Sequence, residues 1–230
     1  MDNGTYAHYH DNTSHGEDAF LIRELSLDSV LDAVLDGLTE KEEGTGKIAS
    51  TLTADKLRYD RIQKVQDVID LLTQANQELY ETTEGAAKTT ATVALKLGKQ
   101  LYIVNVGDSP AYLIREGKIM ELTTLDKSPI YHAVCNRVIG EIPGLFRYHK
   151  NQIDLQSGDR LVLVTDGIID NLFPEEILSV VNKSQTPQEA VRGLEMRIDE
   201  KRSINVGRRD VFRVFKPDDA TAIIRYFPTA

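Results

Sequence analysis

The chain has 230 residues, of which 41% are hydrophobic and 27% are charged, as in an ordinary soluble globular protein. Its net charge of −9 argues against a nucleic-acid partner, because phosphate backbones need a basic face. The one cysteine, Cys135, excludes an intrachain disulfide and favours a reducing, cytoplasmic location. No signal-peptide pattern and no membrane-length apolar run occurs, so we expect no membrane partner.

The apolar pattern changes between strand-like and helix-like stretches along the chain. The expected elements, in order, are strands at 19–25 and 29–37, a short and then a long amphipathic helix within 46–84, hairpins at 89–109 and 111–122, a loop-rich insert at 123–157, a strand at 161–165, a helix opened by the capping box Thr186–Glu189, and a strand at 220–227.

Strands joined by tight hairpins must be antiparallel. Two antiparallel sheets with helices packed outside would bury all of these apolar faces. The predicted fold class is therefore α+β, a four-layer α/β/β/α sandwich. No repeat or linker divides the chain, so we expect one domain over residues 1–230.

Aspartates stand at the edges of the expected strands. Asp36 and Asp166 end apolar runs and are each followed by glycine, Asp108 ends a third run, and Asp18 and Asp218 precede strands. Each alone could be a turn or capping residue, which is common for aspartate. Together they favour a site for hard divalent cations, which prefer oxygen ligands, while the scarcity of histidine and cysteine argues against zinc.

Six motifs resemble, in order, those of one family. They are GEDAF, VLDG, KTTATVALKL, LYIVNVGDSPAYLIREGKI, RLVLVTDGIIDNLFPEEI and KPDDATAII. The chain is similar over about residues 16–227 to the metal-dependent serine/threonine protein phosphatases, the PPM or protein phosphatase 2C family, and most of all to the branch that includes the mitochondrial-type and SpoIIE-like members. The resemblance implies the sandwich expected above, with metals in a cleft at one end.

The resemblance also implies an activity, hydrolysis of phosphoserine and phosphothreonine in a phosphoprotein substrate. A water bridging two Mg²⁺ or Mn²⁺ ions would attack phosphorus, and we expect the enzyme to be a monomer. Asp36 would bridge both ions, and the Gly37 carbonyl would help to hold one of them. Asp166 and Asp218 would hold the other, which makes Asp36, Asp166 and Asp218 the catalytic groups.

Further acidic residues match outer positions of the family's site. Glu17 and Asp18 would bind metal-bound waters. Asp108 and Asp170, with Asp166, match the residues of a weaker third metal site. The sequence does not say which metal or which phosphoprotein is used.

The chain departs from the family's pattern beside these ligands. Thr39 and Glu40 replace a glycine pair, and Leu38 stands where some members carry a histidine proposed as general acid. The usual phosphate-binding arginine is missing, its place being taken by residues 13–15. The insert at 123–157 is short, so the flap that shapes substrate choice is expected to be reduced.

Two alternatives stay open. The lost glycines and arginine allow a pseudophosphatase, a binding or regulatory module that keeps the fold without the activity. The basic stretch from Lys201 to Lys216 is expected to be a solvated loop, but one of its arginines could instead replace the missing phosphate clamp.

Overall fold

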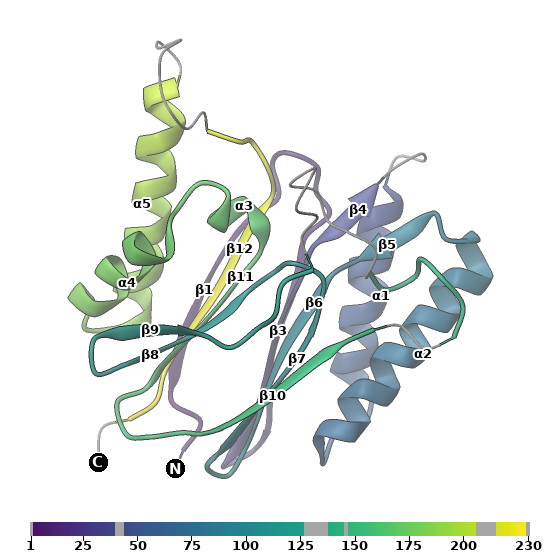
Figure 1. The fold of residues 1–230 in the computed structure, drawn as a ribbon, viewed down its shortest axis with the longest axis horizontal. Helices are drawn as coiled ribbons and strands as arrows, with labels where there is room; N and C mark the ends of the chain where they lie inside the picture. Colours follow the sequence, from purple (N-terminus) through teal and green to yellow (C-terminus); the bar gives the residue numbers. More distant parts are fainter. Residues whose placement is uncertain (1, 40–43, 127–137, 145–146, 206–214, 229–230) are drawn as a thin grey trace.

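The computed structural model describes residues 2–39, 44–126, 138–144, 147–205 and 215–228. Its layers are those of the predicted α/β/β/α sandwich: two five-stranded antiparallel sheets lie face to face, and helices cover the outer face of each (Figure 1). The N- and C-termini lie together at one end of the sheets, and α3 (Asp166–Ile169) lies at the other (Figure 1).

The strands divide into three sheets. The first has the order β10 (His149–Asp154), β7 (Gln100–Val106), β6 (Ala91–Leu97), β3 (Ser29–Leu35), β2 (Ala19–Ser26). The second has the order β1 (Thr5–Asp11), β12 (Ala220–Tyr226), β11 (Arg160–Val164), β8 (Ala111–Arg115), β9 (Lys118–Glu121). The short strands β4 (Gly37–Thr39) and β5 (Ala87–Thr89) pair separately.

Two helix pairs cover the sheets. Helices α1 (Thr45–Tyr59) and α2 (Val65–Thr83) pack on the first sheet, and α4 (Pro174–Lys183) and α5 (Pro187–Asn205) pack on the second (Figure 1). The expected capping box of α5 forms in half: the Glu189 amide donates to Thr186 Oγ1 over 3.2 Å, but the Glu189 carboxylate accepts from the amide of Gln185, over 2.8 Å. Apolar side chains fill three layers, one under each helix pair and one between the sheets, where Val34, Leu113 and Ile223 meet.

The predicted helices, hairpins and last strand are confirmed, but the two five-stranded sheets contain two strands that were not foreseen, and the short strands β4 and β5 and helix α4 were not foreseen either. β1 precedes the first expected strand, and β10 lies inside the stretch expected to be loop-rich, so that expectation was wrong for residues 149–154. Both are edge strands with mostly polar sequences (TYAHYHD and HKNQID), which give no apolar alternation. Residues 127–137 and 145–146 of the insert lie outside the described residues.

A buried ion pair joins the two sheets. Arg225 of β12 donates from Nε and Nη2 to both carboxylate oxygens of Asp32 on β3, over 2.7 and 2.8 Å. Arg225 is 0% exposed and Asp32 is 1% exposed. Arg225 also donates to the carbonyl of Asn3, so the pair ties the N-terminal segment to the sandwich.

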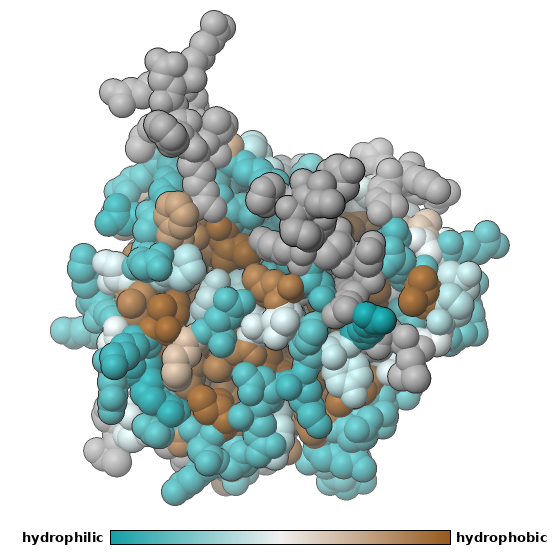
Figure 2. Space-filling model, in the orientation of Figure 1, coloured by the Kyte–Doolittle hydropathy of each residue, from teal (hydrophilic) through white to brown (hydrophobic). Residues whose placement is uncertain are grey.

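No helix in the described part of the chain is long and apolar enough to cross a membrane. On the face shown in Figure 2, the hydrophobic side chains among the coloured residues form separate patches between hydrophilic ones.

Candidate active site

The strand-end aspartates come together at the end of the sandwich that is remote from the chain termini. Asp36 follows β3, and Asp166 follows β11 as the first residue of α3. Burial raises the pKa of Asp36 well above its usual range, and the negative charges of Asp166, Asp18, Asp108 and Asp218 raise it further. The aspartates singled out in the sequence therefore repel one another within one cleft.

The same crowding affects the other carboxyls. Burial raises the pKa of Asp166 to about 7, and neighbouring Asp218 adds to the shift. Burial raises the pKa of Asp18 to about 8, although hydroxyl donors oppose it. Asp18 and Asp108 are buried, whereas the side chains of Asp166 and Asp218 are 15% and 24% exposed. The cleft thus presents some carboxylates to solvent and holds others behind them.

Asp18 is held by two threonine hydroxyls. Thr165 Oγ1 and Thr221 Oγ1 both donate to Asp18 Oδ2, over 2.8 and 2.6 Å. Because the one hydroxyl proton of Thr221 is used in this way, its oxygen accepts from His10 Nδ1 at 2.9 Å. When Asp18 is ionised, the chain of hydrogen bonds from β1 to Asp18 therefore requires the tautomer of His10 that carries a proton on Nδ1.

Asp219 is a site residue that the sequence reasoning missed. Its carboxylate accepts hydrogen bonds from the backbone amides of Ser14, His15 and Glu17, over 3.1, 2.9 and 2.7 Å. It thereby folds the loop that carries Glu17 and Asp18 onto the start of β12. The signal was the doubled aspartate in KPDD, of which only Asp218 was assigned a role.

The altered loop after Asp36 is tied into the site. The Thr39 hydroxyl donates to the Glu17 carboxylate and accepts from the Gly46 amide over 3.0 Å. A Cβ on Gly37 would lie 2.4 Å from the Gly46 carbonyl oxygen and 2.6 Å from that of Glu17. The backbone after Asp36 is thus packed too closely for any other residue, and Thr39 holds Glu17 in the absence of the family's glycine pair.

Asp36 itself is fixed through its main chain. Its carbonyl oxygen accepts from the Thr90 amide and from the Thr89 hydroxyl over 2.8 and 2.9 Å. Its amide donates to Thr90 Oγ1 over 3.1 Å. These bonds hold the strand end, so the carboxylate faces the cleft from a rigid backbone.

Asp170 lies one turn after Asp166, as expected, and its amide donates to the Asp166 carbonyl over 2.7 Å. A lysine reaches the same place: Lys216 Nζ lies 2.6 Å from Asp170 Oδ2. Burial lowers the pKa of Lys216, but the hydrogen bond to Asp170 and the surrounding negative charges outweigh it, so the net shift is upward.

The rest of the basic stretch has other partners where it is described. Lys201 binds Glu176 and the Asn171 carbonyl, and Arg202 binds Asp11. Arg208, Arg209 and Arg213, which include the arginines considered for a phosphate clamp, lie outside the described residues. At the place of the family's arginine, His15 Nε2 lies 3.8 Å from Asp218.

The donor set of the cleft suits a hard divalent cation. It offers carboxylate oxygens and the backbone around Gly37, and neighbouring negative charges raise the pKa values of Asp36 and Asp166. As they stand, no three His, Cys, Asp or Glu side chains among the described residues converge closely enough to hold one ion. The chemistry therefore fits the predicted metals, while the ligands would have to draw together around them.

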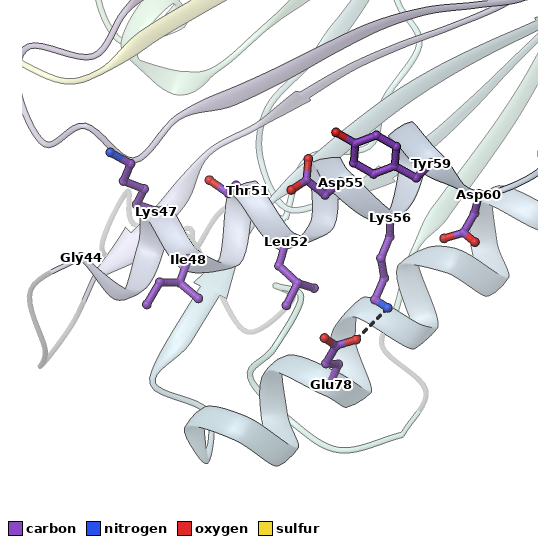
Figure 3. A pocket seen from close by; sticks show the side chains of 10 residues that line it. All are labelled: Gly44, Lys47, Ile48, Thr51, Leu52, Asp55, Lys56, Tyr59, Asp60 and Glu78. Carbon is purple, nitrogen blue, oxygen red and sulfur yellow. Dashed lines mark ion pairs between the residues drawn. The ribbon is translucent and has the colours of Figure 1, made fainter.

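A separate groove of about 660 Å³ lies along α1 and α2, away from these aspartates (Figure 3). Its lining includes Ile48, Leu52 and Tyr59, and an ion pair of 2.7 Å joins Lys56 to Glu78 across it. None of the site residues predicted from the sequence lines this groove.

Comparison with known proteins agrees with this geometry. The family model described as Stage II sporulation protein E (SpoIIE) matches residues 47–208. "Probable protein phosphatase 2C 80" of Arabidopsis thaliana is 28% identical over 92% of this chain and 54% of its own length. "Probable protein phosphatase 2C 62" of the same plant is 27% identical over 72% of this chain and 22% of its own length.

The chain thus spans between about a fifth and about half of these two relatives. Among solved structures, the catalytic domain of the serine/threonine protein phosphatase PstP in complex with two manganese ions superposes with a TM-score of 0.75. The identity is 20%, and 97% of this chain and 98% of that chain are covered. Sequence and fold lead to one conclusion: the chain belongs to the SpoIIE group of the PPM, or protein phosphatase 2C, family.

Proposed function

We propose that this protein hydrolyses phosphoserine and phosphothreonine monoesters of a phosphoprotein with the help of two divalent cations, Mg²⁺ or Mn²⁺. The observation that carries the proposal is the gathering of Asp36, Asp166 and Asp218 in one place, where the charges of Asp166 and Asp218 raise the pKa of Asp36 and the charge of Asp218 raises that of Asp166. The likeness to a fold that is known with two manganese ions supports it.

In this proposal, Asp36, the Gly37 carbonyl, Asp166 and Asp218 hold the cations. When bound, these ions would neutralise phosphoryl oxygens and lower the pKa of a water. Asp36 is suited to the central place, because its backbone is fixed on both sides by Thr89 and Thr90.

Other residues of the chain hold the loops around the cleft in place. Asp219 binds the backbone of residues 14–17, and the two threonine hydroxyls orient Asp18. Leu38 lies on β4 and carries no proton to donate, so the leaving oxygen would take its proton from water. Glu17 and Asp18 would order waters at the rim, and Asp108 and Asp170 would contribute to a weaker third cation position.

Substitution of Asp166 by asparagine tests the function, because it removes a ligand charge at nearly constant volume. We expect turnover of p-nitrophenyl phosphate and of phosphothreonine peptides in manganese to fall more than tenfold, with the fold retained in circular dichroism, since the loss of one ligand charge weakens cation binding. The matched control is Asp199→Asn on the outer face of α5, where the side chain is 59% exposed and turnover should not change.

Two results would count against the proposal. Equal wild-type turnover in EDTA and in manganese would exclude a cation-dependent mechanism. Tight manganese binding without any turnover on a phosphopeptide panel would favour the pseudophosphatase alternative.

A further inference from the structure

Lys216 places an ammonium group among three carboxylates of the candidate metal site. Its Nζ lies 2.6 Å from Asp170 Oδ2, 3.6 Å from Asp166 Oδ2 and 3.6 Å from Asp218 Oδ2. At such distances, one positive charge offsets much of the repulsion among three negative ones. This arrangement is unlike an ordinary surface ion pair, which joins one cation to one anion.

The main chain of Lys216 is held in place from behind. The side-chain amide of Asn171, which is 3% exposed, accepts from the Lys216 amide and donates to the Lys216 carbonyl, over 3.0 and 2.9 Å. The same amide group donates to the Gly167 carbonyl over 2.9 Å. Asn171 thus joins the segment before β12 to α3, so the lysine stem starts beside Asp166 and Asp170.

The side chain therefore begins from a fixed point and ends at a fixed set of anions. Lys216 comes two residues before Asp218, and Asp170 comes four residues after Asp166. The candidate ligands Asp166 and Asp218 are therefore close in sequence to Asp170 and Lys216, respectively. The contact with Asp170 is the shortest of the three, so a divalent ion that bound Asp170 would have to displace the ammonium.

We propose that Lys216 is a tethered cation that takes the place of a divalent ion at Asp170, so that this protein holds two divalent ions in the cleft and not three. The proposal rests on the proposed function and adds to it a residue that sets how many metal ions bind. In this proposal, Asp170 stays paired with Lys216 and does not bind a metal ion. It also gives the metal-free cleft a positive charge of its own.

Direct counting of bound manganese tests this proposal at constant pH, for example by electron paramagnetic resonance of the free ion together with calorimetric titration. Wild type should bind two ions. Lys216→Gln, which keeps most of the stem and removes the charge, should bind a third ion or bind its weakest ion at least about tenfold more tightly, since a competing cation has been removed. Lys216→Arg keeps the charge and should still bind two.

Lys183→Gln at the exposed end of α4 is the control, because it changes the net charge equally at a distance from the cleft.

A measurement on the metal-free protein completes the test. In EDTA, Lys216→Gln should melt at a lower temperature than wild type. In the background of Asp170→Asn, the same substitution should change the melting temperature little, since the two groups act as a pair.

The outcomes separate this inference from the proposed function. If wild type binds manganese and Lys216→Gln binds the same number of ions with affinities within twofold, the inference is wrong and the proposed function stands. If wild type binds no manganese but Lys216→Gln does, the inference is wrong as well, because it requires two ions in the wild type. Absence of binding in both variants overturns both.

Discussion

The sharpest consequence of the carboxylate cleft is that cations should stabilise the whole fold, and that Asp36→Ala should abolish most of this effect. Asp36 ends β3, and the charges of Asp166, Asp18, Asp108 and Asp218 all raise its pKa. Its removal should therefore weaken every cation position and also relieve repulsion in the metal-free protein.

The magnitude follows from linkage. A ligand that binds only the folded state stabilises it by about 2.7 kcal/mol per site at a concentration 100 times its dissociation constant. The unfolded chain has no such site, because Asp36 and Asp218 are separated by more than 180 positions in the sequence. For a protein of this size, about 2.7 kcal/mol corresponds to a rise of roughly 5 to 10 °C in melting temperature.

The assay is a set of thermal melts of wild type, Asp36→Ala and Asp70→Ala, each in EDTA and in excess manganese. Asp70 is an exposed residue of α2 and serves as the control. Wild type and the control should gain the full rise, and Asp36→Ala should gain little while melting at least as high as wild type in EDTA. A wild-type melting temperature that is equal in EDTA and manganese would refute the reasoning, because the carboxylates would then share no metal site.

Three further predictions follow from the buried polar groups. In EDTA, the contribution of the cleft carboxyls to the free energy of unfolding should fall as the pH rises from about 4 to about 8, because the raised pKa of Asp18 lets the folded state bind more protons than the unfolded one. Thermal melts across this range should show a smaller fall in stability for Asp18→Asn than for wild type. An equal fall would contradict the raised pKa of Asp18. His10→Ala should weaken manganese binding about two- to tenfold, which corresponds to the loss of one hydrogen bond. His10→Asn keeps a donor near the position of Nδ1 and should weaken manganese binding less. Equal effects of the two variants would mean that the hydrogen bond from His10 to Thr221 does not help to orient Asp18. Asp32→Asn should cost about 3–5 kcal/mol in urea unfolding, because it leaves the buried Arg225 with only the charge of Glu24, 3.6 Å away. Pairing it with Arg225→Met should recover much of this cost. A cost below about 1 kcal/mol would show that the pair is not isolated from water.

The sequence by itself was enough for most of the secondary structure. Apolar residues at helical spacing fixed α2, and the turn pairs Gly98-Lys99 and Glu116-Gly117 fixed the hairpins β6–β7 and β8–β9. These features are local, because a side-chain period and a turn depend on residues only a few positions apart. The position of each aspartate at a strand end was readable in the same way.

Local patterns could not identify two of the four edge strands of the five-stranded sheets, β1 and β10. β1 and β10 are polar, and they become strands because β12 and β7 offer unpaired backbone groups to them. In the pairing of β1 with β12, Thr5 lies opposite Tyr226, at the other end of the chain. No sequence period records a pairing of that kind.

The tertiary structure also decided what lies around each predicted ligand. The amides of residues 14–17 meet Asp219 more than 200 positions away, and Lys216 meets Asp170 across 46. In the sequence, Lys216 was one of several cations in a basic stretch, and only folding separates it from Lys201 and Arg202, which bind elsewhere. The residue types could be read one at a time, but the energy of a charge depends on which other charges lie within a few ångströms, and that is set by the packing of distant segments.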